Sequence, residues 1–240
     1  IFRKENLFVS VTVDQDGYQG LEAQIARLLP LLYSDPVRKG SIRYDFGQKN
    51  EGFYTAGQVQ YVAESGNFKK AGFAYTGALR ILKVILSYDY LWMNLRVKGG
   101  AYGCMSNFRR TGDSFLVSYR DPHLKNTLDV FRGTPEYLRN FEADEREMTK
   151  YIIGTISELD VPMNPSAQGA LALNAWFAGL DREDLQKERD EILNAQPEGI
   201  RALADLIQAV LEQENICVVG SESAIDKNKK ILKHVEPLVH

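Results

Sequence analysis

The stretch LRVKGGAYGCMSNF, residues 95–108, joins a long helical pattern to a strand pattern. Arg96 lies in the last turn of the expected helix, and Tyr102 is the second residue of the expected strand. Gly99 and Gly100 supply a helix stop and allow the backbone to turn sharply between them. We therefore expect the side chains of Arg96 and Tyr102 to converge on one space at the edge of a sheet.

An arginine and a tyrosine at such a point suit a peptide carbonyl. Both side chains are hydrogen-bond donors at neutral pH. Two convergent donors can hold a carbonyl oxygen or the oxyanion that develops from it, and an exposed strand edge beside them can pair with an extended peptide. The same spacing is also typical of a purely structural arrangement, with a helix-end arginine, a glycine cap and a core tyrosine. The pattern alone leaves both interpretations open.

Hydrophobic periodicity predicts the elements on both sides of this stretch. Before it, strands are expected over 6–14 and 52–62 and helices over 18–33 and 75–96. After it, a hairpin is expected over 101–108 and 114–119, then helices over 123–140, 143–159, 166–178, 182–195 and 197–212, and a strand over 215–220. Strands early and helices late predict a single α+β domain over 1–240, with helices on one side of the sheet.

Composition excludes several classes of partner. The net charge of −3 gives no reason to expect nucleic acid, and no run of about 18 apolar residues predicts a membrane span. Cys104 and Cys217 lack metal-like spacing, and two reduced, buried thiols are expected over a disulfide. Reduced thiols favour a compartment such as the cytoplasm or an organellar matrix. Because the chain opens on Ile1 without Met and enters a strand pattern at once, we expect a piece of a longer polypeptide.

Familiar catalytic motifs are missing from the sequence. The histidines are His123, His234 and His240, and none stands in HxxEH or HExxH spacing. GxSxG, GxGxxG and GxxxxGK[ST] do not occur either. We therefore expect no complete active site and no bound metal in this chain alone. Trp92 and Trp176 lie in helical patterns and are expected in the core or at a domain interface.

RVKGGAYG at 96–103, followed by SYRDP at 118–122, closely resembles the C-terminal part of the presequence-protease branch of the insulinase-type (pitrilysin, M16) zinc peptidases. The wider resemblance covers most of the chain, including ELDVPMNPSAQG at 158–169. It implies an insulinase/pitrilysin (LuxS/MPP-like) α+β domain, with a mostly antiparallel sheet covered by helices on one side. It also implies a peptidase of four similar domains in two halves that close around a chamber, with this chain as the last domain.

The resemblance divides the chemistry between the halves. The N-terminal half would bind zinc through HxxEH and a further glutamate, and the C-terminal half, without zinc, would contribute an arginine and a tyrosine that match Arg96 and Tyr102. Arg96 would grip the substrate backbone, and Tyr102 would help to polarise the scissile bond. Gly99, Gly100 and Gly103 would let the peptide approach the backbone closely. Because this chain lacks HxxEH, it departs from the full pattern of the family.

Two functions are compatible with this resemblance. The first is the substrate-contacting part of a zinc metalloendopeptidase for unstructured peptides, with the N-terminal half of the same polypeptide as its partner. The second is a non-catalytic structural or assembly subunit of the same fold. An ordinary α/β module is a third possibility. Whether Arg120 stabilises a turn or lines the chamber stays open, as does self-association of the isolated domain.

Overall fold

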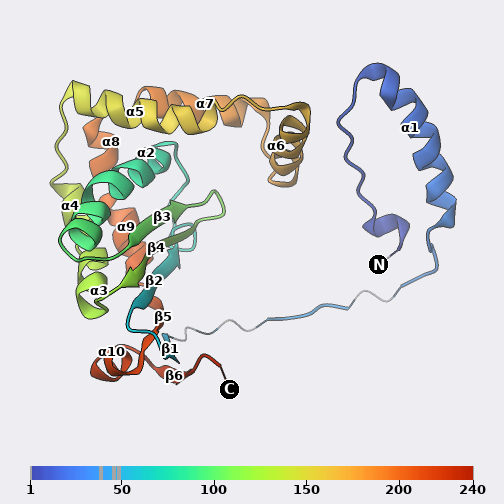
Figure 1. The fold of residues 1–240 in the computed structure, drawn as a ribbon. Helices are drawn as coiled ribbons and strands as arrows, with labels where there is room; N and C mark the ends of the chain where they lie inside the picture. The colour runs from blue at the N-terminus through green and yellow to red at the C-terminus, as the bar shows by residue number, and fades with distance from the viewer. Residues whose placement is uncertain (1, 38–39, 45–46, 48–49, 240) are drawn as a thin grey trace. The chain divides into compact units, whose positions relative to one another are not determined.

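The computed structural model describes residues 2–37, 40–44, 47 and 50–239 (Figure 1). Contacts divide the chain into two compact units, which we call the N-terminal unit (Ile1–Asp45 and Val161–Leu185) and the sheet unit (Phe46–Asp160 and Gln186–His240). In the described part, no helix is long and apolar enough to cross a membrane.

The sheet unit is built on six strands. They are β1 (Glu51–Thr55), β2 (Gln60–Asn67), β3 (Gly103–Phe108), β4 (Asp113–Asp121), β5 (Asn215–Ser221) and β6 (His234–Pro237). Their order in the sheet is β3-β4-β2-β5-β1-β6. Three neighbouring pairs are antiparallel, and the two pairs that involve β1 are parallel. The sheet is therefore mostly antiparallel, as predicted, with a parallel portion at the β6 edge.

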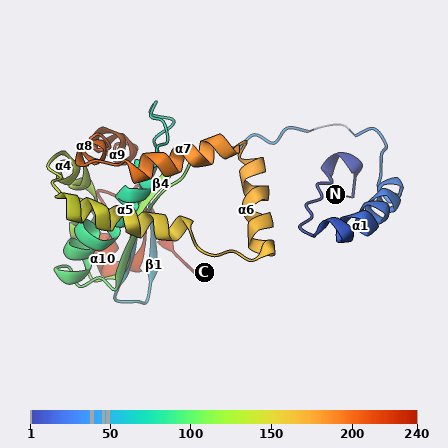
Figure 2. The same cartoon turned by 90° about the horizontal axis from the view of Figure 1, so that it is seen from above.

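Helices cover one face of this sheet (Figures 1 and 2). They are α2 (Ala78–Ile85), the π-helical η3 (Leu86–Tyr90) and η4 (Trp92–Val97), α3 (Lys125–Arg132), α4 (Thr134–Arg139), α5 (Glu145–Leu159), α7 (Arg182–Leu193), α8 (Pro197–Arg201), α9 (Ala204–Leu211) and α10 (Glu222–Lys227). Alternate strand residues such as Val62, Leu116 and Val218 are buried. This period of two is typical of a sheet with one covered face, and it confirms the predicted α+β arrangement.

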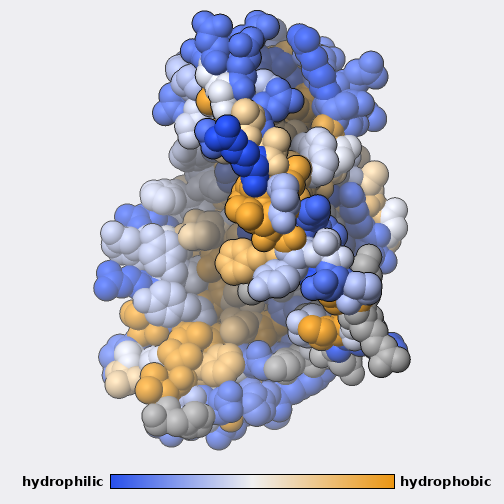
Figure 3. Space-filling model, turned by 90° about the vertical axis from the view of Figure 1, so that its right-hand side faces the viewer, coloured by the Kyte–Doolittle hydropathy of each residue, from blue (hydrophilic) through white to orange (hydrophobic). Residues whose placement is uncertain are grey.

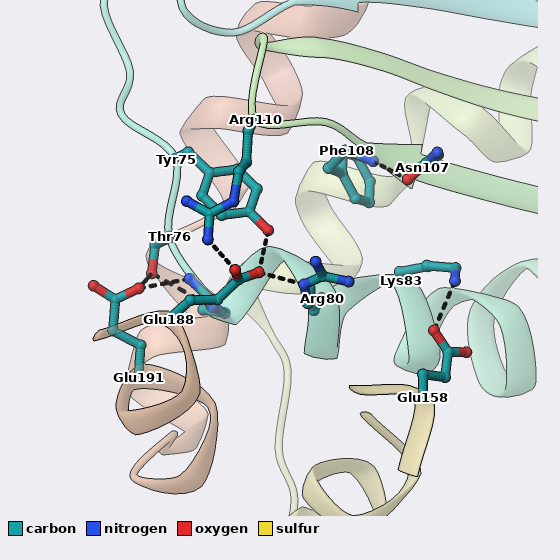
Figure 4. A network of polar contacts seen from close by, with 12 residues as sticks. Tyr75, Thr76, Arg80, Lys83, Asn107, Phe108, Arg110, Glu158, Glu188 and Glu191 are labelled. Atoms are coloured by element: carbon teal, nitrogen blue, oxygen red, sulfur yellow. Dashed lines mark hydrogen bonds and ion pairs between the residues drawn. The ribbon is translucent and has the colours of Figure 1, made fainter. Parts of the chain in front are cut away.

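Glu188 of α7 joins two elements that lead to the stretch around Arg96 and Tyr102. Figure 4 shows Tyr75, Arg80 and Arg110 pointing toward its carboxylate. The Tyr75 hydroxyl donates to Oε1 at 2.6 Å, Arg80 of α2 also donates to Oε1, and Arg110 of the β3–β4 turn donates to Oε2. Glu188 thus ties the start of the long helix to the hairpin.

Burial and charge act in opposite directions on this carboxylate. Burial by itself would raise the pKa of Glu188, but the hydrogen bonds from Tyr75 and Arg80 and the two guanidinium charges bring it below its ordinary value. Burial raises the pKa of Tyr75 to about 12, and the hydrogen bond to Glu188 is the second contribution to this rise. Glu188 is therefore ionised and Tyr75 protonated at neutral pH.

The N-terminal unit contains η1 (Lys4–Asn6), α1 (Gln15–Leu28), η2 (Leu29–Leu31) and α6 (Pro165–Phe177). Asp14 caps α1 by accepting from the Gly17 N–H at 2.8 Å, and Asn164 caps α6 by accepting from the Ala167 N–H at 2.9 Å. Large apolar side chains of this unit are exposed, among them Phe2, Leu31, Ile42 and Phe177. Figure 3 shows apolar side chains gathered in patches on the face that it draws.

The strand predicted over 6–14 is wrong. Residues 7–14 pair with no strand among those described. Instead, the Phe8 ring centre lies 4.7 Å from that of Trp176, and the Thr12 Cβ would lie 2.9 Å from a Cβ placed on Gly169. Phe8 and Thr12 thus lie against α6, and an alternating pattern does not by itself identify a partner strand. Trp176 is exposed and is not a core residue.

Smaller differences have local causes. The strand predicted over 52–62 is two strands, with a bend at 56–59 that contains Gly57. The helix predicted over 123–140 ends its first part at Gly133, and α10 and β6 were not predicted. Both cysteines are free thiols, as predicted, but Cys217 is exposed and Cys104 is only half-buried.

Candidate functional site

Arg96 lies on a helix that changes its winding. The predicted helix over 75–96 is present as 78–97, but it passes from α-helical into π-helical turns after Ile85. The last hydrogen bond of the π-helical turns runs from the Lys98 N–H to the Met93 carbonyl at 3.0 Å. The guanidinium carbon of Arg96 lies 4.6 Å from the ring centre of Trp92. π-Helical turns of this kind occur frequently at functional sites.

Gly100 ends the helix and directs the chain toward Tyr102. Its φ of +76° favours glycine, and its N–H donates to the Arg96 carbonyl at 3.0 Å. Arg96 Nη1 in turn donates to the Tyr102 carbonyl, and its guanidinium carbon lies 5.5 Å from the Tyr102 ring centre. The structure therefore brings Arg96 and Tyr102 together. Tyr102 lies just before β3 and not inside it.

The β3–β4 pairing brings the two sequence motifs together. The Tyr102 N–H donates to the Arg120 carbonyl at 3.2 Å, and Gly103 is paired with Tyr119. The Tyr102 and Tyr119 rings meet edge to face with their centres 5.5 Å apart. RVKGGAYG and SYRDP are thus neighbours in space, although a turn separates them in the sequence.

The three predicted glycines have different surroundings. A Cβ on Gly99 would lie 2.6 Å from the Leu95 carbonyl oxygen, and one on Gly103 would lie 2.7 Å from Cζ of Tyr119. Both positions are therefore closely packed within the chain. A Cβ on Gly100 would lie 3.7 Å from Cγ of Pro122, an ordinary contact distance, and of the three glycines it is the one that borders the pocket.

An open pocket of about 610 Å³ lies over this junction, lined by Val59, Arg96, Gly100, Ala101, Tyr102 and Arg120. Tyr102 is 55% exposed, and no described residue makes a hydrogen bond with its hydroxyl. Arg96 gives one N–H to the Tyr102 carbonyl, and a guanidinium group has five. Both side chains can therefore donate to a carbonyl oxygen that enters the pocket.

Cys104, two residues after Tyr102 in the chain, is no candidate nucleophile. Burial raises the pKa of its thiol to about 11, with the charge of Asp121 adding to this effect and that of Arg96 opposing it. The thiol is therefore protonated at neutral pH, whereas nucleophilic attack requires the thiolate.

No metal site is found among the described residues, where no three His, Cys, Asp or Glu side chains gather as ligands. The backbone N–H of His123 donates to Asp121 Oδ1 at 2.8 Å, and His234 lies 3.3 Å from Glu236 in β6. These residues do not fit a zinc ion, and what the pocket offers a ligand is hydrogen-bond donors and positive charge.

Trp92 was missed as a candidate for this site. It is 39% exposed and packs on Arg96, so it is not a core residue, and its expected place at a domain interface stays a prediction. Its position four residues before Arg96, one helical turn away, is the signal that could have indicated this contact.

Comparisons with known proteins find relatives over most of the chain. Residues 50–222 match the family model described as the PreP C-terminal domain. Protein HypA from Clostridium perfringens is 44% identical over 239 residues, which are 100% of this chain and 25% of that protein. Presequence protease 1 of Arabidopsis thaliana, chloroplastic/mitochondrial, is 32% identical over 229 residues, 94% of this chain and 21% of that protein.

Solved structures agree with this fold. Pitrilysin matches with a TM-score of 0.58 at 15% identity, over 86% of this chain and 23% of its own. The peptidase M16 inactive domain from Pseudomonas fluorescens matches with a TM-score of 0.55 at 17% identity, over 95% of this chain and 52% of its own. The chain thus spans about a quarter of the length of the curated relatives above.

Proposed function

Because the chain belongs to the PreP C-terminal domain family of the M16 peptidases, we propose that it is the C-terminal, substrate-contacting part of a zinc metalloendopeptidase. The intact enzyme would degrade unstructured peptides inside a closed chamber. The observation that carries this proposal is the convergence of Arg96 and Tyr102 on one open pocket. The N-terminal half of the same polypeptide would be the partner and would hold the zinc.

The contribution of this chain is to bind the peptide and to stabilise negative charge. Trp92 and the Tyr102 carbonyl already hold the Arg96 guanidinium in place. Donors that are fixed before the substrate arrives need no reorganisation as charge develops, which makes them effective at a carbonyl oxygen. The Tyr102 hydroxyl would be the second donor to the same oxygen or to a neighbouring backbone carbonyl.

Exposed apolar residues support the proposal that this chain packs against another part of a longer polypeptide. Phe2, Leu31 and Ile42 of the N-terminal unit are each more than half exposed. Large apolar side chains exposed in numbers are typical of protein contact surfaces. Burial of these side chains against another part of a longer polypeptide would account for them.

The test is peptide cleavage by the full-length polypeptide that contains this chain. Arg96→Ala and Tyr102→Phe should each lower kcat by roughly ten- to a thousand-fold, the range for losing one oxyanion donor. Arg146→Ala and Tyr88→Phe change the same residue types at exposed positions and should leave kcat unchanged. If both site variants turn over peptide like the unaltered enzyme, the proposed roles are wrong.

The alternative is a non-catalytic structural or assembly subunit of the same fold. A subunit with no substrate has no need for preset donors beside an open pocket, so the pocket favours the peptidase. Full-length protein with zinc that forms a stable assembly but cleaves no peptide would support the alternative.

A further inference from the structure

Arg120 has a backbone conformation that arginine rarely adopts. Its φ is +50°, in the left-handed region that non-glycine residues avoid at a cost in free energy. The β2–β4 register explains where this occurs. Gln60 pairs with Asp121 but Val62 pairs with Ser118, so β4 contains an extra residue at this point. Such a β-bulge turns a side chain in a new direction.

The bulge places the Arg120 side chain at the pocket. Its guanidinium carbon lies 5.6 Å from the Tyr102 ring centre, and that of Arg96 lies 5.5 Å from the same centre. Both arginines line the pocket. Two guanidinium groups therefore lie around one phenol ring.

Neither of these guanidinium groups has an ion-pair partner within the described part of the chain. Six other arginines of the sheet unit have one, whereas Arg109 and Arg146 have none among the described residues; the six are Arg80, Arg110, Arg132, Arg139, Arg189 and Arg201. The carboxylate next in the chain, Asp121, is engaged elsewhere, since it accepts from the His123 N–H at 2.8 Å and the Thr127 hydroxyl at 2.7 Å. The pocket thus holds two like charges that repel each other and that an incoming anion would neutralise.

We propose that Arg120 is a third substrate-contacting residue, and that it forms with Arg96 a subsite for a carboxylate of the bound peptide. This inference rests on the proposed function. Guanidinium groups match carboxylates with paired, charge-assisted hydrogen bonds. A cation–π contact with an exposed ring is weak and does not by itself account for a strained backbone. The carboxylate can come from an Asp or Glu side chain or from the C-terminus of the peptide.

The experiment uses the full-length enzyme and four quenched fluorescent peptides of one sequence. They differ by Glu or Gln at one position and by a free or amidated C-terminus. Unaltered enzyme should prefer the peptides with the relevant carboxylate by roughly tenfold in kcat/KM, expressed mainly in KM, as one charge-assisted contact allows. Anisotropy measurements of peptide binding should show the same preference in Kd.

Variants of Arg120 separate a contact role from a structural one. Arg120→Gln and Arg120→Gly should abolish the preference, and Arg120→Lys should retain part of it. Arg120→Gly should abolish the preference without lowering the denaturation midpoint of the enzyme, because glycine accepts a positive φ. Arg146→Gln, an exposed change in α5, should leave the preference intact.

The outcomes distinguish the carboxylate sources and the two proposals. A difference within the Glu/Gln pair indicates a side-chain carboxylate, and one within the acid/amide pair indicates the C-terminus. Equal treatment of all four peptides, or a preference that survives Arg120→Gly, overturns the subsite. If the enzyme cleaves no peptide, the proposed function fails, and the anisotropy measurements still decide the subsite.

Discussion

At the scale of single residues, Glu64 is a buried acidic group of the sheet without a hydrogen-bond partner among the described residues. It lies on β2 and is fully buried. Arg132 Nε is 3.8 Å from Oε1. Burial raises the pKa of Glu64 to about 7, the charge of Arg132 opposes this rise, and that of Glu214 adds to it.

Because the pKa of Glu64 is raised, its contribution to the stability of the fold decreases as the pH rises. The folded state binds the Glu64 proton more tightly than the unfolded state, so the contribution to stability is fully present below the ordinary pKa of 4.5. It is lost as the pH rises through about 7. Ionisation of Glu64 should therefore destabilise the protein in mildly alkaline solution.

Glu64→Gln should remove this pH dependence. A pKa unit corresponds to about 1.4 kcal/mol. From pH 5 to pH 8, the free energy of unfolding of the variant should therefore rise by up to roughly 3 kcal/mol relative to that of the unaltered protein. Urea denaturation at the two pH values measures this gain. Glu222→Gln, at an exposed position, is the control. The same pH dependence in Glu64→Gln and the unaltered protein would show that Glu64 is ionised throughout.

At the scale of elements, Glu188 differs from Glu64 because its buried carboxylate is fully hydrogen-bonded and its pKa is lowered. Its buried carboxylate is held by Tyr75, Arg80 and Arg110, which come from the segment before α2, from α2 itself and from the β3–β4 turn (Figure 4). Arg96 and Tyr102 lie at the opposite ends of the long helix and of β3. Glu188 therefore holds together the ends of the long helix and of the hairpin that lie away from the pocket.

Glu188→Gln should destabilise the fold by roughly 3 kcal/mol at pH 7, because two guanidinium groups lose their buried, negatively charged partner. Since the pKa of Glu188 is lowered, its stabilisation is present above its ordinary pKa and is lost as the pH falls through the folded value. The difference from the unaltered protein should therefore shrink in acid. Denaturation at pH 7 and pH 4 checks this, and a difference that stays constant would contradict it.

The elements also show what the sequence could and could not predict. The long helix and the hairpin were predictable because periodicity and the Gly99-Gly100 stop are local signals. The bulge at Arg120 was not, since it depends on how β4 pairs with β2, far away in the sequence. For the same reason β6, which pairs with β1 across most of the chain, was not predicted. Residues 7–14 show that one alternating pattern serves a strand or a helix contact equally well.

At the scale of the whole molecule, we propose that the candidate site is one part of a larger active site. It offers donors and positive charge on an open pocket, and the described residues offer no place for a metal. The chain is about a quarter as long as its curated relatives. We therefore propose that its role is completed by another part of a longer polypeptide, which the exposed apolar side chains of the N-terminal unit would contact.

Reconstitution tests this claim most directly. Cleavage of a quenched fluorescent peptide is measured with zinc for this chain alone, for the separately expressed upstream part, and for their mixture. We expect little cleavage by either part alone and recovery on mixing, with recovery lost when the chain carries Arg96→Ala. Cleavage by this chain alone, or an upstream part as active alone as in the mixture, would contradict the proposal that this chain completes the site.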